Sequence, residues 1–176
     1  MPPKVKISRE EIIKTAVLIV KTSGVNELNA RNIATKLGCS TQPIFSNFQT
    51  MDELKCEVVC EAEKIYQQYV ANGSYFSYKE KAMAYISFAK QEKNLFKLLF
   101  LEEGQSDFIN GEPLQALCMD TGLSGDTAQL FNLEMWAFVH GLAVMTANAS
   151  FPLHDTVISR IFDDAYQGLK TRFNLR

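Results

Sequence analysis

The sequence predicts an all-α protein in which a three-helix N-terminal domain precedes a larger helical domain, with about nine helices in total. Three observations favour this class. Apolar residues recur at helical spacing along most of the chain, no clean alternation predicts a strand, and glycine and proline are sparse. With 176 residues, of which 47% are apolar, the chain can bury a substantial core.

The first helix is predicted to begin after Ser8 and to run to about Thr22. Ser8 and Glu11 have the spacing of a capping box, in which each side chain bonds the other residue's backbone amide. Gly24 is expected to end the helix. The apolar residues within it recur at helical spacing and predict one buried face: Ile12, Ile13, Ala16, Val17, Ile19 and Val20.

Two short helices are predicted next, joined by a tight turn. Asn29 can cap the first of them, and Gly38 stands where a C-terminal glycine is expected. Ser40 is expected to cap the second, which places Pro43 in its first turn, where the missing amide costs no helical hydrogen bond. Two short helices joined in this way, with a preceding helix packed on them, predict a helix-turn-helix.

A long helix is predicted from about Met51 to Ala71, because Thr50 and Glu53 form a second capping box. The predicted domains are therefore residues 1–50 and 51–176. Five more helices are expected, over residues 79–90, 94–102, 113–121, 126–149 and 154–173.

The second helix of a helix-turn-helix reads DNA through the residues near its N-terminus. Ile44 and Phe48 are four residues apart and are expected to face the protein interior. The residues predicted to face the bases are Thr41, Gln42, Pro43, Phe45 and Ser46. A glutamine amide can pair with adenine, and threonine, proline and phenylalanine can contact thymine methyl groups. For Phe45, packing against the protein remains an equal alternative.

The charge distribution supports a DNA-facing N-terminal region. Residues 1–55 contain eight Lys or Arg and five Asp or Glu. Residues 56–176 contain ten Lys or Arg and fifteen Asp or Glu. A basic region on an acidic chain is typical of a surface that meets phosphates. The candidates for phosphate contacts are Lys4, Lys6, Asn29, Arg31, Lys36, Asn47, Thr50 and Lys55.

The stretch "IIKTAVLIVKTSGVNELNARNIATKLGCSTQPIFSNFQTMDELK" closely resembles the DNA-binding domain of the TetR family of transcriptional regulators. The resemblance covers Glu10 to Leu54 in one register. Members of that family usually have Tyr at the position of Phe45, often His at that of Asn47, and commonly Lys at that of Met51. The phosphate contacts that the Tyr and Lys side chains make are therefore not expected here, and Lys55 or the helix N-terminus can substitute.

The resemblance implies that the last two long helices pair with those of a second subunit in a four-helix bundle. Apolar residues on nearly all sides of the segment from Leu130 to Ala147 agree with burial on two sides. The residues expected at this homodimer interface are Val139, Ala143, Ala147, Ile158, Ile161, Phe162, Ala165 and Leu169.

The resemblance also implies a ligand pocket between the long helix after the DNA-binding domain and the C-terminal helices. An apolar and aromatic lining suits a small apolar or aromatic ligand. The candidate lining residues are Phe88, Phe96, Phe100, Met119, Trp136 and His140. Ordinary core packing is the alternative for each aromatic residue. For His140, the expected polar partner is a ligand, a carbonyl group or Glu134.

Together these features predict a dimeric, cytoplasmic DNA-binding regulator, a repressor that a small ligand releases from a palindromic DNA operator. The alternative is a DNA-binding regulator without a ligand, which is controlled by protein partners or is constitutive. No nucleophile motif, phosphate-binding loop or metal constellation is present, so neither an enzyme nor a cofactor is expected. A module that binds only protein would leave Thr41 and Gln42 without a role.

The remaining features favour a protein without a membrane span or disulfides. The most apolar stretch, residues 131–147, is short for a membrane span and contains Glu134 and His140. The four cysteines form no CxxC pair. Cys56 and Cys60, one helical turn apart, are expected to be small buried residues, with metal binding or oxidant sensing as the alternative.

Overall fold

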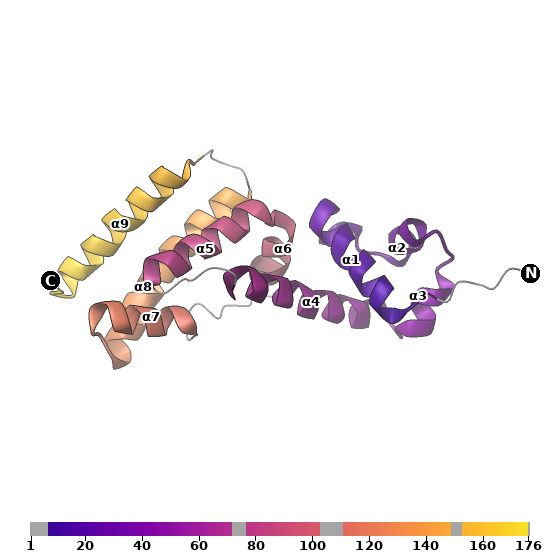
Figure 1. The fold of residues 1–176 in the computed structure, drawn as a ribbon, viewed down its shortest axis with the longest axis horizontal. Coiled ribbons are helices and arrows are strands. Elements are labelled where there is room, and N and C mark those ends of the chain that lie inside the picture. Colours follow the sequence, from indigo (N-terminus) through magenta and orange to yellow (C-terminus); the bar gives the residue numbers. More distant parts are fainter. Residues whose placement is uncertain (1–6, 72–76, 103–110, 149–152, 176) are drawn as a thin grey trace, which may run out of the picture. The chain divides into compact units, whose positions relative to one another are not determined.

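The computed structural model describes residues 7–71, 77–102, 111–148 and 153–175, and in these ranges the chain is helical without strands (Figure 1). The α-helices are α1 (Arg9–Ser23), α2 (Ala30–Leu37), α3 (Gln42–Asn47), α4 (Met51–Ala71), α5 (Tyr78–Gln91), α6 (Lys93–Lys97), α7 (Glu112–Thr121), α8 (Gly125–Ala147) and α9 (Asp155–Arg172). A 3-10 turn, η1 (Val25–Glu27), and a π-helical segment, η2 (Leu98–Glu102), complete the described secondary structure. The all-α prediction is confirmed.

The described residues divide into two compact units, which we call the N-terminal and the C-terminal unit. Residues 7–67 and 94–102 belong to the N-terminal unit, and the other described residues belong to the C-terminal unit. This division differs from the predicted boundary after Thr50. Most of α4, as far as Gln67, belongs to the N-terminal unit, where Leu54 and Val58 are fully buried.

Helix α1 is the central helix of the N-terminal unit and packs against α2 and α3. Its predicted capping box is present, because the Ser8 hydroxyl accepts from the Glu11 amide at 3.2 Å and the Glu11 carboxylate accepts from the Ser8 amide at 2.8 Å. The predicted apolar face is buried except for Ile13, which is half-buried. The helix ends at Gly24, as expected.

The turn between α2 and α3 depends on Gly38, which has φ +66° in the left-handed region. Such a conformation costs about 1–2 kcal/mol for a residue with a Cβ atom. We therefore expect Gly38→Ala to lower the free energy of unfolding by about 1 kcal/mol, although the added methyl group would meet no atom within 4 Å.

Gly168 provides the matched control for Gly38, because it lies in the interior of α9, is exposed and is equally open to a methyl group. Gly168→Ala should stabilise the protein by about 0.5–1 kcal/mol through helix propensity. Urea denaturation of both variants measures the two changes. A stabilising effect of Gly38→Ala would contradict the assigned role of the turn.

The start of α3 differs from the prediction by one residue. Thr41, and not Ser40, occupies the N-cap position, and no side chain caps the helix. Thr41 already has helical dihedral angles, and its carbonyl accepts from the amides of Ile44 and Phe45 at 3.1 and 3.3 Å. Pro43 lies in the first turn, as predicted, where its missing amide leaves no gap in the helix.

Another predicted helix, residues 94–102, is divided in the structure. Helix α6 ends at Lys97, and the chain continues as the π-helical η2. The wider turn accompanies the burial of the adjacent Leu98 and Leu99, which are at most 1% exposed. In a regular α-helix, successive side chains point about 100° apart around the helix axis. The apolar periodicity of the sequence assumes this geometry throughout, so it could not predict the π-helical segment.

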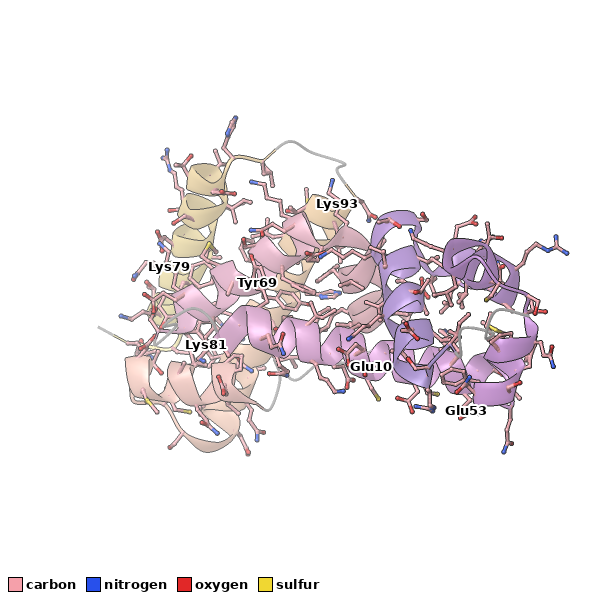
Figure 2. All side chains as sticks on the ribbon, turned by 45° about the vertical axis from the view of Figure 1, so that its right-hand side comes forward. Glu10, Glu53, Tyr69, Lys79, Lys81 and Lys93 are labelled. Atoms are coloured by element: carbon pink, nitrogen blue, oxygen red, sulfur yellow. The ribbon has the colours of Figure 1, made fainter. Side chains whose placement is uncertain are left out.

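The C-terminal unit is built around α5 and α8, which pack along each other, with α7 against both and α9 against α8. Large aromatic side chains fill its interior: Tyr78, Tyr85, Phe88, Phe131 and Phe162. Ion pairs connect its helices at the surface, including Lys79 with Asp163 at 2.6 Å and Lys81 with Glu112 at 2.7 Å (lysines labelled in Figure 2).

Helix α8 has a fully buried face that includes Phe131, Met135 and Val139. Other apolar residues of the same helix remain exposed in the single chain: Leu130, Leu133, Phe138 and Met145. Within the described ranges, α8 is also the one helix long and apolar enough to cross a membrane, a test that the core helix of a soluble protein equally passes. Its packing along α5 agrees with the predicted core helix.

Candidate DNA-binding interface

Helix α3 has two chemically distinct faces within the N-terminal unit. Ile44 and Phe48 are buried, at 0% and 2% exposure, as the sequence predicted. Thr41, Gln42 and Phe45 are exposed. The Phe45 ring is 53% exposed, so the structure decides between the two alternatives for this residue in favour of the outward orientation. The outward face of α3 is therefore polar at its start and apolar one turn later.

The side chains of Thr41 and Gln42 make no hydrogen bond to any other described residue. Their donors and acceptors can bond an external partner without first breaking an internal contact. The Gln42 amide carries both a donor and an acceptor, which is the combination that pairs with the major-groove edge of adenine.

Ser46 and Asn47 are engaged differently, since both bond back to their own helix. The Ser46 hydroxyl donates to the Gln42 carbonyl at 2.9 Å, and the Asn47 amide donates to the Pro43 carbonyl at 2.7 Å. These bonds stabilise the short helix. If the Ser46 hydroxyl donated its proton to DNA, that bond would have to replace its hydrogen bond to the Gln42 carbonyl.

The residues predicted to contact phosphates differ in their exposure and in their contacts within the protein. Asn29 is the N-cap of α2, where its side-chain oxygen accepts from the Asn32 amide at 2.9 Å. Arg31 is exposed, whereas Lys55 is half-buried in a shallow depression that Asp52 and Glu102 also line. The predicted contacts Lys4 and Lys6 lie outside the described residues.

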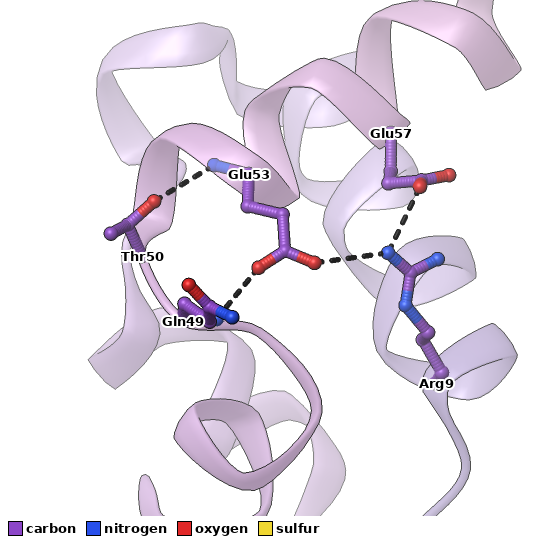
Figure 3. A network of polar contacts seen from close by, with 5 residues as sticks. All are labelled: Arg9, Gln49, Thr50, Glu53 and Glu57. Atoms are coloured by element: carbon purple, nitrogen blue, oxygen red, sulfur yellow. Dashed lines mark hydrogen bonds and ion pairs between the residues drawn. The ribbon is translucent and has the colours of Figure 1, made fainter.

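Thr50 caps the start of α4 by accepting from the Glu53 amide at 3.1 Å. That bond uses an oxygen lone pair, so the hydroxyl proton can donate to a phosphate. The reciprocal half of the predicted capping box goes to a neighbouring residue, because the Glu53 carboxylate accepts from the Gln49 amide at 2.7 Å (Figure 3).

A charged network, which sequence reasoning missed, supports the end of α3 (Figure 3). The Arg9 guanidinium lies 3.3 Å from the Glu53 carboxylate and 2.9 Å from that of Glu57. It also lies over the Phe48 ring, 4.5 Å from the ring centre. The hydrogen bond from Arg9 lowers the pKa of Glu57, so this carboxylate stays charged at neutral pH. Arg9 thus connects the start of α1 with α3 and α4.

The predicted ligand-pocket residues fall into both units. Phe96 and Phe100 belong to the N-terminal unit, where their rings lie 5.2 Å apart. The others belong to the C-terminal unit. Phe88 is fully buried, Trp136 stacks on His140 at 5.0 Å, and Met119 is 81% exposed on α7.

The described polar partner of His140 is Tyr85, whose hydroxyl lies 2.9 Å from Nδ1. Glu134, one of the partners expected from the sequence, instead forms an ion pair with Arg172 at 2.7 Å. Burial lowers the pKa of His140 below its usual 6.5 and therefore favours the neutral imidazole.

This lowered pKa predicts a pH dependence of stability. The unfolded chain binds a proton at His140 at higher pH than the folded chain does, so the contribution of the neutral imidazole is complete above pH 6.5. It is lost progressively as the pH falls below that value. We expect the free energy of unfolding to fall less in His140→Gln than in wild type between about pH 7 and pH 5.5.

Urea denaturation at a series of pH values measures this difference. Because the slopes are compared, a constant loss of packing in the variant does not affect the result. Equal slopes for His140→Gln and wild type would contradict the prediction.

The predicted dimer-interface residues are largely enclosed within the single chain. Five of them are buried there, at 3% exposure or less: Val139, Ala143, Ala147, Ile158 and Phe162. Side chains that are already covered have little surface left for a partner. Ile161, Ala165 and Leu169 are half-buried on α9. The exposed apolar surface of α8 and α9 is formed by other residues: Leu130, Leu133, Phe138, Met145 and Val157.

These features define a class: an all-α protein with an N-terminal helix-turn-helix whose second helix has an outward face that begins with polar residues. No protein-family model matches the chain, and no curated protein matches it. Solved structures do resemble it, and they show that it has the fold of TetR-like transcriptional regulators.

A TetR-like transcriptional regulator from Rhodococcus sp. RHA1 matches with a TM-score of 0.68 at 14% identity, covering 96% of this chain and 98% of that one. A protein from Pseudomonas aeruginosa PAO1, described as a transcriptional regulator, matches with a TM-score of 0.63 at 14% identity. The match covers 92% of this chain and 89% of that one. The multidrug-binding protein EbrR, solved with imidazole, matches with a TM-score of 0.59 at 16% identity. The match covers 89% of this chain and 88% of that one.

Proposed function

We propose that this chain is a cytoplasmic DNA-binding transcriptional regulator whose α3 enters the major groove. The observation that carries this proposal is the division of α3 into a buried face and an outward face that begins with Thr41 and Gln42. The shared fold of a TetR-like regulator supports it. In a helix-turn-helix, residues at the start of the second helix contact base edges.

We further propose that the regulator acts as a homodimer on a palindromic operator. One helix-turn-helix reads only a few base pairs, whereas two related by a two-fold axis read both halves of a palindrome. The exposed apolar residues of α8, including Leu133, Phe138 and Met145, supply a surface that association of two chains would cover.

A small-molecule ligand that releases a repressor from DNA is the favoured form of regulation. EbrR, which has the same fold, is a multidrug-binding protein. Within the C-terminal unit, the stacked Trp136 and His140 beside Tyr85 offer aromatic surface and a polar group. Release requires that the ligand bind one conformation more tightly than the other. The alternative is a regulator without a ligand, controlled by protein partners or constitutive.

Selection of duplexes from a randomised pool tests the proposed function. The full-length chain should enrich a palindromic sequence with two half-sites about one helical turn, or a multiple of it, apart. The selected duplex should then bind at least about 10³-fold more tightly than a random duplex at physiological salt. Failure to enrich any sequence would overturn the assignment of α3 as a base-reading helix.

Arg31 should contribute to affinity without contributing to sequence preference. We expect Arg31→Ala to weaken binding to the selected and random duplexes by similar factors, because a phosphate contact carries no sequence information. The slope of log affinity against log salt concentration should fall by about 1. Fluorescence anisotropy at several salt concentrations measures both effects.

Lys93, an exposed cation at the start of α6, provides the matched control. Lys93→Ala removes the same charge from the C-terminal unit and should leave the salt dependence unchanged. An unchanged slope for Arg31→Ala would exclude Arg31 from the phosphate contacts.

A further inference from the structure

Cys56 and Cys60 of α4 are both exposed, which overturns the expectation that they are small buried residues. The buried face of α4 is formed by other residues: Leu54, Val58, Val59 and Ala62. Exposed free thiols are reactive and are normally avoided on protein surfaces. Neither cysteine contributes to the core, so packing does not account for this pair.

The spacing of the two cysteines allows both sulfur atoms to bind the same metal or metalloid atom. Residues four apart on a helix lie on the same face, with Cβ atoms about 5–6 Å apart. This is the spacing at which two histidines of one helix bind a single zinc ion in metalloproteases. Both positions lie well inside α4, so the backbone holds the pair in register.

The number of ligands decides which chemistry fits. Among the described residues, no group of three or more His, Cys, Asp or Glu side chains could hold a metal ion. A structural zinc site requires four protein ligands. Two thiolates suit a soft centre that accepts two sulfur ligands, and thiolate ligands select such metals.

We propose that Cys56 and Cys60 form a dithiol site that binds a soft, thiophilic metal or metalloid through two sulfur atoms. Monovalent copper and trivalent organic arsenicals share this chemistry. With phenylarsine oxide, two As–S bonds form, and the arsenic-bound oxygen leaves as water with the two thiol protons, so no oxidant or reductant is required. With monovalent copper, two Cu–S bonds form and the thiol protons pass to solvent.

The test uses the full-length chain without DNA, so its result is independent of the proposed function. Phenylarsine oxide and monovalent copper are titrated separately, and intact mass measures the adduct. One arsenical should bind per chain with loss of one water. The adduct should withstand excess monothiol and be reversed by dithiothreitol, because only a dithiol matches the chelate.

Single-cysteine variants decide whether both sulfurs take part. Cys56→Ser and Cys60→Ser should each weaken binding at least tenfold, and the double variant should abolish the monothiol-resistant adduct. Cys39→Ser and Cys118→Ser, which alter the half-buried cysteines, should bind as wild type does. Circular dichroism checks that each variant folds.

Two results would overturn the proposal. One is equal binding by wild type and both single variants, and the other is removal of the wild-type adduct by monothiol. A difference in binding between the two probes would identify the kind of ligand that the site takes. Binding of copper alone indicates a metal site, and binding of the arsenical alone indicates a site for organic metalloids.

Discussion

Phe48→Ala should lower the free energy of unfolding of the N-terminal unit by about 3–5 kcal/mol. Phe48 is 2% exposed at the end of α3, and the Arg9 guanidinium lies 4.5 Å above its ring. Truncation to alanine removes the buried ring and leaves a cavity, while Arg9 loses its cation–π contact. Both losses act where α1, α3 and α4 meet.

Hydrogen exchange of the backbone amides of α1, α2 and α3, combined with urea denaturation, measures this loss in the N-terminal unit itself. Phe45→Ala is the matched control, because it removes the same ring from the same helix at a position that is 53% exposed. We expect it to change stability by no more than about 0.5 kcal/mol. Equal destabilisation by the two variants would contradict the two-faced arrangement of α3.

Gln42→Ala should cost about 1–3 kcal/mol in binding to the selected duplex, which is roughly a tenfold to hundredfold loss of affinity. The physical reason is the loss of a paired donor and acceptor at a base edge. Binding to a random duplex, which depends on phosphate contacts, should change much less. The variant should fold normally, because the Gln42 side chain makes no hydrogen bond to another described residue.

Fluorescence anisotropy with the two duplexes measures this difference, and Gln49→Ala is the matched control. Gln49 is also exposed, but it follows the C-terminal end of α3, away from the residues proposed to contact base edges. Gln49→Ala should retain both affinities. Equal losses on both duplexes for Gln42→Ala would show that Gln42 does not read bases.

The elements of the helix-turn-helix could be predicted because their signals are local. The capping box at Ser8, the glycine at Gly38 and the proline at Pro43 each act within one or two turns of the backbone. The orientation of Ile44 and Phe48 followed from their spacing of four residues. The start of α3 was misplaced because Ser40 and Thr41 are both good caps, and sequence reasoning could not choose between them.

The network around Arg9 could not be predicted from local patterns. Arg9 is separated from Glu53 and Glu57 by 44 and 48 residues. Only the packing of α1 against its neighbours determines which of the many charged residues lies within reach. The same holds for His140, whose described partner Tyr85 comes from another helix, 55 residues away.

Burial within long apolar segments was the least predictable property. The sequence of α8 contains apolar residues on nearly all sides, and helical periodicity alone could not say which side the rest of the chain covers. Several residues expected at a dimer interface lie in the core instead, while Leu133 and Met145 remain exposed.

By itself, the sequence determined the helical class, the helix-turn-helix and the residues at the start of its second helix, because caps, turns and periodicity act over a few residues. Only the tertiary structure decided that Phe45 points outward, that Arg9 supports Phe48, and that Cys56 and Cys60 form an exposed pair. These properties depend on which other elements pack against each helix face, and contacts between residues far apart in the chain determine that packing.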